Sequence, residues 1–365
     1  MAYSKNFTIL MAGGGTGGHL LPGISLAKAF QSKNRQTKIV FFVPGTPVDL
    51  AILSSTDFPF TLNPMRSFPS SFWKYPNFFC QFFFGWHKAL HVFRKNRPDL
   101  VVGLGGYGSW SAGCLAKKYN LPLVMLEANK IAGKVVRKLA KDCKRVYTSG
   151  EIQGISEDKI KPLGIPIRFS RLQTEERQNI EKNSFTILVM GGSLGAKCIN
   201  DSLVQALPFL NPWKHKIEFI HLCGKNKSLV EQEYKKNGMC HHVFSFCNNM
   251  EDLYLQSDLI ISRAGGSTLS EITAMGMPSI LVPFARSADG HQEANALSMA
   301  KSNASLVILE KELTGELLAS KIKELILDKA KISEMSKAAL NLAKPFAATD
   351  IVSDVYSLLG KTEKT

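Results

Sequence analysis

The stretch FTILMAGGGTGG occupies residues 7–18, and a near copy of it, FTILVMGGSLGA, occupies residues 185–196. In each copy a run of apolar and β-branched residues, typical of a buried strand, meets a cluster of glycines. A helical pattern follows, over Leu20–Phe30 after the first copy and over Ala196–Leu207 after the second. A strand, a glycine turn and a helix in this order open a Rossmann-like unit, so the repeat predicts two such units in one chain.

The rest of the chain alternates short apolar runs with helical patterns. In the first half we expect strands at Phe7–Ala12, Lys38–Val43, Leu100–Gly103, Leu121–Leu126 and Arg145–Thr148. In the second half we expect them at Phe185–Met190, Ile217–Leu222, His242–Phe246, Leu259–Ser262, Ser279–Val282 and Ala304–Ile308. Helices are expected between them, for example at Ser267–Ala274 and Gln292–Ala300. This alternation predicts an α/β protein with parallel sheets that helices cover on both faces.

The length of 365 residues exceeds what one hydrophobic core usually supports, so two domains are expected. The segment KPLGIPIRF, residues 161–169, has the glycine and prolines of a hinge. We therefore expect domains at 1–163 and 164–345, followed by a C-terminal helix within 346–365 that either stays separate or packs back on the first domain. Because open parallel sheets bind ligands at the carboxyl ends of their strands, the two domains are expected to face each other across a deep cleft.

The formal net charge of +15 favours an anionic partner, which could be nucleic acid, an acidic membrane surface or a phosphorylated ligand. The seven cysteines are scattered and contain no CxxC pair, as expected of reduced thiols in a cytosolic protein. Cys240, His241, His242 and Cys247 are close in sequence but lack the ligand spacing of a zinc site. The N-terminus reads as a strand and no run of about 20 apolar residues occurs, so membrane contact would be made from the surface.

The first glycine cluster is open to three interpretations. Gly13, Gly15 and Gly18 satisfy the GxGxxG pattern of dinucleotide sites, but the second strand carries no acid at its end before Asp49. A P-loop needs Lys-Ser/Thr after the last glycine, where this chain has His19 and then leucine. What remains is a glycine turn at a helix N-terminus, which allows close approach of a ligand and offers N–H groups to an anion.

His19 follows this turn at the expected start of the helix. Either it is a structural residue with a local hydrogen bond, or it is a catalytic base. The glycines around it would expose the ring to the ligand site, and imidazole is well suited to take a proton from a sugar hydroxyl. We therefore expect His19 to be the base, with Glu127 as the second candidate.

Seven motifs occur in order along the chain: GGGTGGHLLPGISLA (13–27), GLGGYGSWSAG (103–113), LEANKIAG (126–133), GIPIR (164–168), GGSLGAKCIN (191–200), SRAGGSTLSE (262–271) and HQEANA (291–296). Together they closely resemble the MurG family of peptidoglycan N-acetylglucosaminyltransferases, over the stretch from about Phe7 to about Ile308. The resemblance implies a GT-B fold and an inverting transferase. The implied donor is UDP-N-acetylglucosamine, the acceptor is lipid I, an undecaprenyl-diphosphate-linked N-acetylmuramoyl pentapeptide, and the product is lipid II.

The resemblance also implies the roles of individual residues. Beside His19, the donor site is lined by Thr16, Gly17 and Gly18, and Asn129 lies in a loop that faces donor and acceptor. The diphosphate is contacted by Arg168 and Ser193, and the uracil is read by the backbone at Cys247. The nucleoside is held by Gly266, Ser267, Thr268, Leu269, Ser270 and Glu271, with Glu271 on the ribose hydroxyls, and Gln292 contacts the sugar.

Two of these assignments have a simpler alternative, because Glu271 could be a solvated helix carboxylate and Arg168 could form a hinge salt bridge. The sequence contains no Asp-x-Asp motif of metal-dependent sugar transferases. We therefore expect helix N-termini and Arg168 to stabilise the leaving diphosphate, without a metal or another cofactor. Three positions depart from the family pattern, since Ile165, Leu194 and Ala128 replace an asparagine and two glutamines, and these changes bear on the catalytic rate and on acceptor detail more than on the fold.

The segment 66–97 is basic and aromatic, and it lies within a longer stretch, from Asp57 to Asp99, that has no acidic residue between these two. Its basic residues are Arg66, Lys74, Lys88, Arg94, Lys95 and Arg97, and its aromatic residues are Phe68, Phe72, Trp73, Tyr75, Phe78, Phe79, Phe82, Phe83, Phe84, Trp86 and Phe93. Aromatic side chains favour the membrane–water boundary and cations favour anionic headgroups. About half of the aromatic residues are expected in the core instead, because helices of this fold bury one face.

We expect a peripheral protein on the cytoplasmic face of the bacterial inner membrane, among other cell-wall synthesis proteins. Nucleic acid, the other class of partner for basic and aromatic residues, is disfavoured because no recognised nucleic-acid motif accompanies them. Two other functions remain open. One is a UDP-sugar transferase with a different lipid acceptor, and the other is a catalytically weak cell-wall scaffold. The presence of His19, Asn129, Ser193, Glu271 and Gln292 argues against the scaffold.

Overall fold

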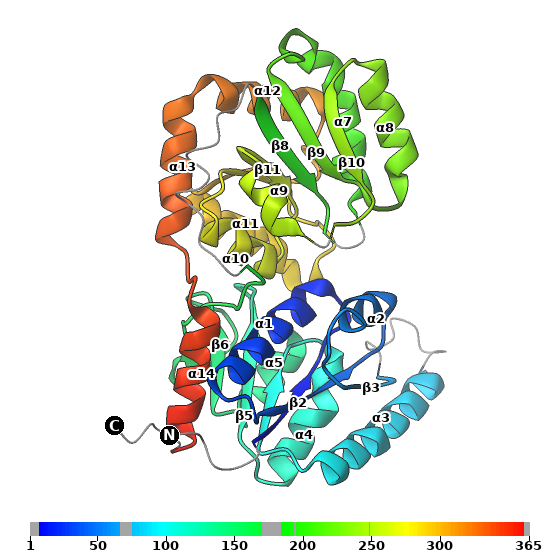
Figure 1. Ribbon diagram of the computed structural model, residues 1–365, viewed down its shortest axis with the longest axis vertical. Coiled ribbons are helices and arrows are strands. Elements are labelled where there is room, and N and C mark those ends of the chain that lie inside the picture. The colour runs from blue at the N-terminus through cyan, green and yellow to red at the C-terminus, as the bar shows by residue number, and fades with distance from the viewer. Residues whose placement is uncertain (1–6, 66–74, 170–183, 193–194, 248, 361–365) are drawn as a thin grey trace. The chain divides into compact units, whose positions relative to one another are not determined.

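The computed structural model describes residues 7–65, 75–169, 184–192, 195–247 and 249–360, without the side chains of 75–80. The chain divides into two compact units (Figure 1). Unit 1 comprises the chain up to Arg168 together with the C-terminal stretch from Lys344, and unit 2 comprises Phe169–Ala343. Each unit is an α/β domain with its own parallel sheet, as the repeated glycine motif predicts.

Unit 1 is built on a sheet of seven parallel strands in the order β3-β2-β1-β4-β5-β6-β7. Their bounds are β1 Thr8–Ala12, β2 Lys38–Val43, β3 Phe60–Leu62, β4 Leu100–Gly103, β5 Leu123–Glu127, β6 Arg145–Thr148 and β7 Ile160–Lys161. One face of the sheet is covered by α1 (Gly17–Lys33), α2 (Pro47–Leu53) and α14 (Ala347–Leu358). The other face is covered by α3 (Tyr75–Asn96), α4 (Trp110–Lys118) and α5 (Lys134–Leu139). The order 3-2-1-4-5-6 is that of a Rossmann fold.

Unit 2 repeats this arrangement with six parallel strands in the order β10-β9-β8-β11-β12-β13. Their bounds are β8 Phe185–Met190, β9 Ile217–Leu222, β10 Cys240–Phe244, β11 Leu259–Ser262, β12 Ser279–Leu281 and β13 Ser305–Val307. One face packs on α7 (Lys197–Leu210), α8 (Lys227–Lys236) and α12 (Gly315–Leu327). The other face packs on α9 (Met250–Leu255), α10 (Gly266–Ala274) and α11 (His291–Lys301). The helix α13 (Lys329–Asn341) contributes Met335 to the core on the α7 face and Ala339 to the core on the α10 face.

All eleven predicted strands are present within about two residues of their expected bounds. The sequence did not predict β3 and β7, which are three and two residues long and lie at the two edges of the first sheet. Because their residues are at most half-buried, they do not form the apolar run by which a buried strand is recognised. Among the helices that the structure describes, none combines the length and the apolar character needed to cross a bilayer.

The boundary between the units differs from the predicted one, because it follows Arg168 instead of preceding Gly164. The Gly164 N–H donates to the Thr148 carbonyl at 2.8 Å, which fixes this segment to the end of β6. A Cβ atom at Gly164 would clash with the Lys344 Cβ, so the backbone here fits closely against the returning C-terminal stretch. The segment Gly164–Arg168, which the sequence placed at the start of the second domain, thus lies in unit 1.

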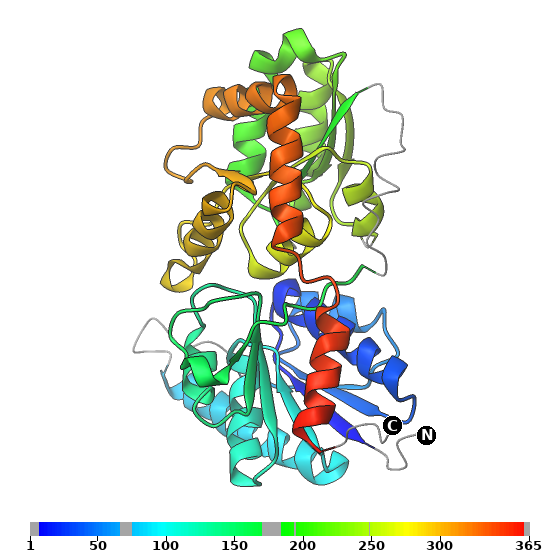
Figure 2. The same cartoon turned by 90° about the vertical axis from the view of Figure 1, so that its left-hand side faces the viewer.

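The C-terminal helix α14 packs beside α1 in unit 1 (Figures 1 and 2). Its buried residues Ile351, Val352, Val355 and Tyr356 join the core that contains Phe7. The helix therefore completes the first unit, although it follows the second unit in sequence.

Candidate functional site

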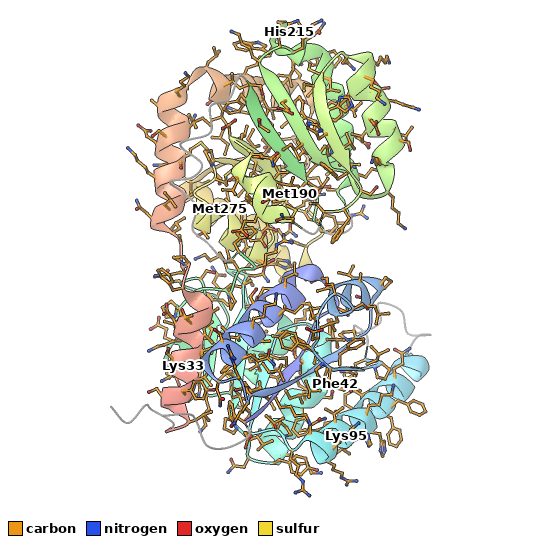
Figure 3. The ribbon with its side chains drawn as sticks, viewed as in Figure 1. Lys33, Phe42, Lys95, Met190, His215 and Met275 are labelled. Carbon is orange, nitrogen blue, oxygen red and sulfur yellow. The ribbon has the colours of Figure 1, made fainter. Side chains whose placement is uncertain are left out.

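The loops at the carboxyl ends of the first sheet are held together by backbone hydrogen bonds. The Gly13 N–H donates to the Phe42 carbonyl at 3.0 Å, and the Leu104 N–H donates to the Ala12 carbonyl at 2.7 Å. The loops after β1, β2 and β4 therefore form one surface at this edge, where ligands of parallel sheets bind. Phe42 lies in the interior of unit 1 beneath this surface (Figure 3).

His19 is half-buried in the first turn of α1, and its ring lies against two loops. Its Nδ1 atom lies 3.3 Å from the Gly14 carbonyl oxygen and 3.3 Å from Thr16 Oγ1. A carbonyl oxygen can only accept, so in the neutral ring a hydrogen bond to Gly14 places the proton on Nδ1 and leaves Nε2 with its lone pair. This is the tautomer that a base acting through Nε2 needs.

Two glycines of the loop after β4 allow this close packing. A Cβ atom at Gly105 would lie 3.2 Å from His19 Cδ2 and 3.3 Å from His19 Nε2. A Cβ atom at Gly106 would lie 3.2 Å from the Gly14 carbonyl oxygen. Both residues have positive φ, of 89° and 71°, which side chains rarely tolerate. The motif GLGGYGS thus places bare backbone beside the imidazole.

The N–H of Gly15, one of the amides of this turn that the sequence suggested for an anion, is engaged within unit 1. It donates at 2.8 Å to Oδ1 of Asp49, a residue of α2 that is 0% exposed. The other carboxylate oxygen accepts from the Thr46 N–H at 3.0 Å, and Thr46 Oγ1 accepts from the Asp49 N–H at 3.2 Å. The first glycine turn is therefore anchored by an internal carboxylate.

Glu127, the second candidate base, is 5% exposed and uses both carboxylate oxygens to hold its own loop. Oε1 accepts from the Asn129 backbone N–H at 3.0 Å and from Asn129 Nδ2 at 2.9 Å. Oε2 accepts from the Gly133 N–H at 2.9 Å. The structure therefore brings Glu127 and Asn129 together, with the asparagine side chain oriented by the carboxylate.

The other predicted residues of unit 1 lie along the same edge or at its end. Gly17 is buried and Gly18 exposed in the first turn of α1, after Thr16 as the N-cap residue. Arg168 is half-buried at the end of the unit's first segment. Ile165 is 2% exposed, so this departure from the family pattern places a buried apolar side chain here.

In unit 2, Glu271 lies on α10 and is only 7% exposed. Tyr254 donates a hydrogen bond from its hydroxyl to Glu271 Oε2 at 3.1 Å. The alternative of a solvated surface carboxylate is therefore wrong. The residues from Gly266 to Ser270 form the preceding turns of the same helix, and Ser270 Oγ donates to the Gly266 carbonyl at 3.1 Å.

The helices α7 and α10 begin at carboxyl ends of strands in unit 2, and their N-cap residues, Ala196 and Gly265, have no side chain that can cap. Their first turns carry no acidic residue. The N–H groups of an uncapped first turn are available to an anion, and the helix dipole favours it. Ser193 and Leu194, which precede α7, lie outside the described residues.

Arg263, a residue of the motif at 262–271 for which no role was predicted, anchors the loop after β12. Its guanidinium donates to the Val282 carbonyl at 3.1 Å and to Glu310 Oε1 at 3.1 Å. Glu310 Oε2 accepts from the Ala285 N–H at 2.8 Å. Burial of Glu310 opposes ionisation, but the bonds from Arg263 and Ala285 outweigh it and lower the pKa of this carboxyl.

This loop orients Gln292. The Phe284 N–H donates to Gln292 Oε1 at 3.0 Å, and the Gln292 N–H donates to Ser287 Oγ at 3.3 Å. With its oxygen engaged, Gln292 presents its amide nitrogen as a donor. The arginine in the motif SRAGGSTLSE was the signal that could have indicated this anchored loop, because a partly buried arginine usually donates hydrogen bonds to several acceptors.

The cysteine and histidine cluster of unit 2 does not assemble as a metal site. Cys247 is half-buried, and its thiol donates to the Asn249 carbonyl at 3.3 Å. His242 Nε2 lies 3.1 Å from Glu218 Oε1 on the neighbouring strand. Within the described residues, no group of three or more His, Cys, Asp and Glu side chains is placed to hold a metal ion.

A series of buried hydrogen bonds supports the glycine loop of unit 2 at Gly195. His221, which is 0% exposed, has Nδ1 3.2 Å from the Tyr234 hydroxyl and Nε2 3.0 Å from Asn200 Oδ1. Burial lowers the pKa of His221 to about 3, so the ring is neutral. Asn200 Nδ2 donates to the Cys223 carbonyl at 3.0 Å, and a Cβ at Gly195 would lie 2.9 Å from that same oxygen.

Known families match both units. Residues 9–148 match the glycosyltransferase family 28 N-terminal domain, and residues 186–354 match the glycosyltransferase family 28 C-terminal domain. The chain is also similar to UDP-N-acetylglucosamine–N-acetylmuramyl-(pentapeptide) pyrophosphoryl-undecaprenol N-acetylglucosamine transferases. It is 34% identical to the one from Geobacter sulfurreducens, over 97% of this chain and 100% of the relative, and 34% identical to the one from Thermodesulfovibrio yellowstonii, over 96% and 98%.

Solved structures share the fold. The crystal structure of Acinetobacter baumannii MurG superimposes with a TM-score of 0.76 at 24% identity, covering 98% of this chain and 100% of that one. A Neisseria meningitidis UDP-GlcNAc 2-epimerase bound to UDP-GlcNAc gives a TM-score of 0.65 at 15% identity, covering 97% and 100%. The two-unit arrangement of parallel sheets is thus that of the GT-B fold.

Proposed function

The chain belongs to glycosyltransferase family 28, and from this premise we propose that it is an inverting N-acetylglucosaminyltransferase of peptidoglycan synthesis. It transfers N-acetylglucosamine from UDP-N-acetylglucosamine to the 4-hydroxyl of lipid I and gives lipid II. The observation that carries the proposal is 34% identity to transferases of that name over nearly the whole of both chains. The residues that each unit orients by itself support it, because they suit the steps that such a reaction needs.

We assign the deprotonation of the acceptor hydroxyl to residues of unit 1. His19 is the base, because its Nδ1 is engaged with the Gly14 carbonyl and its Nε2 retains a lone pair. Glu127 is a positioning residue instead of a second base, because three N–H groups of its own loop already occupy its oxygens. Its role is to orient Asn129 toward the substrates, with Thr16, Gly17 and Gly18 lining the donor sugar.

We assign the binding of the UDP-sugar donor mainly to unit 2. The Glu271 carboxylate, fixed by Tyr254, accepts hydrogen bonds from the two ribose hydroxyls. The uncapped N-termini of α7 and α10, with Ser193, stabilise the charge of the diphosphate. Arg168, the one residue of this set that belongs to unit 1, adds a positive charge for the same diphosphate. Gln292 donates from its amide to the sugar, and the backbone at Cys247 reads the uracil.

The reaction is a single displacement at the anomeric carbon. The oxygen of the acceptor 4-hydroxyl forms a bond to this carbon from the face opposite the diphosphate. The bond from the carbon to the diphosphate oxygen breaks, and its electron pair leaves with UDP. The hydroxyl proton passes to His19 Nε2 and is later lost to water.

The acceptor is lipid-linked, so the enzyme works at a membrane surface. The outward face of α3 supports this, because Phe83 and Phe84 are 60% and 63% exposed. Further along the helix the exposed side chains are basic, namely His87, Lys88, His91, Arg94 and Lys95. Of the other aromatic residues of this helix, Phe93 is buried, and Phe82 and Trp86 are half-buried. The remaining residues predicted for this face lie outside the described residues, namely Arg66, Phe68, Phe72, Trp73 and Lys74. The side chains of Tyr75, Phe78 and Phe79 are not described either.

This exposed face suits anionic lipid headgroups, with the two phenylalanines inserted at the membrane–water boundary. The protein is then peripheral, on the cytoplasmic side of the bacterial inner membrane.

A turnover assay tests the proposed function. The full chain is incubated with UDP-N-acetylglucosamine and a short-chain lipid I analogue, with and without EDTA, and both UDP and the disaccharide product are measured. We expect one UDP per disaccharide and the same rate with EDTA. Turnover with diacylglycerol but not with the lipid I analogue would identify another lipid acceptor, and donor binding without turnover on either would identify a scaffold.

A further inference from the structure

One peptide group in unit 1, between Gly14 and Gly15, is hydrogen-bonded at both of its ends. Its N–H donates to Asp49 Oδ1 at 2.8 Å, and its carbonyl oxygen lies 3.3 Å from His19 Nδ1. Asp49, the peptide and His19 therefore form one continuous chain of hydrogen bonds. The chain runs from a buried carboxylate in α2 to the imidazole at the start of α1.

Asp49 is held firmly in this position. Its side chain is 0% exposed, and it belongs to a capping box in which Thr46 and Asp49 exchange hydrogen bonds at the N-terminus of α2. The glycine turn fits closely around it, because a Cβ at Gly14 would lie 2.9 Å from Asp49 Oδ1. Gly14 and Gly15 have φ angles of 132° and 88°, which only glycine adopts readily.

We infer that Asp49 is a positioning residue for the transfer reaction, and that it acts on His19 through the Gly14–Gly15 peptide; this rests on the proposed role of His19 as the base. Hydrogen bonds in series polarise one another, so a carboxylate on the N–H makes the peptide carbonyl a stronger acceptor. The stronger acceptor holds the ring proton on Nδ1 and stabilises the positive charge that the ring gains when Nε2 takes a proton. In serine hydrolases a carboxylate does the same by direct contact with histidine.

The proton does not travel along this chain. The acceptor hydroxyl gives its proton to Nε2, the Nδ1 proton stays on the ring, and the peptide and Asp49 keep their own protonation states. The partners of the imidazole that the structure describes are the Gly14 carbonyl, the Thr16 hydroxyl and the backbone of Gly105 and Gly106, none of which titrates near neutral pH. Asp49 is thus the charged group that these contacts link to the ring.

The first test compares two variants of the full chain. Asp49→Asn removes the charge but keeps an oxygen for the Gly15 N–H, and Thr46→Ala removes the capping hydroxyl but leaves the carboxylate in place. We expect Asp49→Asn to lower kcat about tenfold or more and to leave KM for the donor within about twofold. Thr46→Ala should lower Tm and leave kcat unchanged. Equal effects of both variants on kcat, or a change of KM alone in Asp49→Asn, would overturn the inference.

The second test does not depend on activity. Nitrogen-15 NMR of the wild-type protein, with His19 identified by its absence in His19→Gln, reports which ring nitrogen carries the proton. We expect the Nδ1–H form in the wild type and a larger share of the Nε2–H form in Asp49→Asn. An Nε2–H form in the wild type would overturn the inference even if the variant does not fold. The expected NMR result in a protein without turnover would show that the hydrogen-bonded chain orients His19 although the proposed function had failed.

Discussion

The Tyr147 hydroxyl donates a 2.8 Å hydrogen bond to Asp354 Oδ2 and so joins β6 to α14 across 207 residues of the chain. Burial, together with this bond, raises the pKa of Tyr147 far above its ordinary value. Arg145 Nε and Lys161 Nζ lie 3.7 and 3.9 Å from the same carboxylate. The last helix is therefore fixed to the edge of the first sheet by polar groups as well as by its apolar face.

Replacing Tyr147 by phenylalanine removes this hydrogen bond and keeps the ring. We expect the free energy of unfolding to fall by about 1 kcal/mol, the typical net value of one internal hydrogen bond, and Tm to fall by a few degrees. Thermal unfolding of the full chain measures the change. Tyr119→Phe, at a tyrosine that is 44% exposed, is the control and should leave Tm unchanged. An equal Tm for Tyr147→Phe and the wild type would show that the bond contributes nothing.

Stability should depend on pH through His221. Burial lowers its pKa from 6.5 to about 3 in the folded protein, so below pH 6.5 the unfolded chain takes up a proton that the folded chain does not. The stabilising contribution is complete above pH 6.5 and is lost as the pH falls toward 3. At pH 5 the loss should be about 2 kcal/mol relative to pH 7, from 1.5 pH units at 1.4 kcal/mol each.

The measurement is urea unfolding at pH 7 and at pH 5 for the wild type and for His221→Gln. The difference between the two proteins removes the contribution of other titrating groups. The variant should be less stable than the wild type at pH 7 but should lose less stability on acidification. Parallel losses in both proteins would exclude His221 as the cause.

The repeated strand and glycine pattern was sufficient to predict both sheets, because buried parallel strands are continuous apolar runs and glycine turns interrupt them. The short edge strands β3 and β7 were not predictable, since they are formed by pairing with a neighbour and not by burial. Which core α14 completes was not predictable either. Its apolar face is visible in the sequence, but the sheet that it covers is decided by tertiary packing.

For the site, the motifs located the loops but not the residues that hold them. Asp49 was noticed only as an acid in the wrong place for a ribose, whereas the structure shows it bound to Gly15. Arg263 lay within a recognised motif without a role, and its acceptors come from the ends of two other strands. Contacts between separate loops leave no periodic signal in the sequence, and for this reason such supporting residues were missed.

Glu271 should govern donor affinity. In Glu271→Gln one carboxylate oxygen becomes an amide nitrogen that cannot accept a ribose hydroxyl proton, so we expect KM for UDP-N-acetylglucosamine to rise about tenfold or more while kcat changes less. Steady-state kinetics with varied donor measures both constants. Glu293→Gln, at an exposed residue of α11, is the control and should behave as the wild type. A fall in kcat alone would contradict a role in donor binding.

His19 should govern turnover. His19→Ala removes the proposed base, for which we expect kcat to fall by about 10²–10⁴-fold, with donor KM nearly unchanged. Single-turnover kinetics at saturating donor separates the chemical step from binding. His215→Ala, at an exposed residue on the periphery of unit 2, is the matched control (Figure 3). If His19→Ala turns over as fast as the wild type, His19 is not the base.

Membrane binding should depend on the exposed face of α3. Phe83→Ser with Phe84→Ser removes the apolar contact, and we expect binding to anionic vesicles to weaken more than tenfold, because burial of one phenylalanine is worth about 1.5–3 kcal/mol. Replacing Lys88, Arg94 and Lys95 by glutamine should weaken binding at low salt and abolish most of its salt dependence, since each cation near the surface contributes about 1 kcal/mol.

Flotation with vesicles of anionic lipid, compared with neutral lipid, measures both effects. Phe209→Ser with Leu229→Ser removes two exposed apolar side chains from unit 2 and serves as the matched control. This control should float as the wild type does, because α3 lies in unit 1. Wild-type protein that stays with the soluble fraction at low salt would refute the membrane proposal. An equal loss of vesicle binding in the control would show that the membrane contact is not specific to α3.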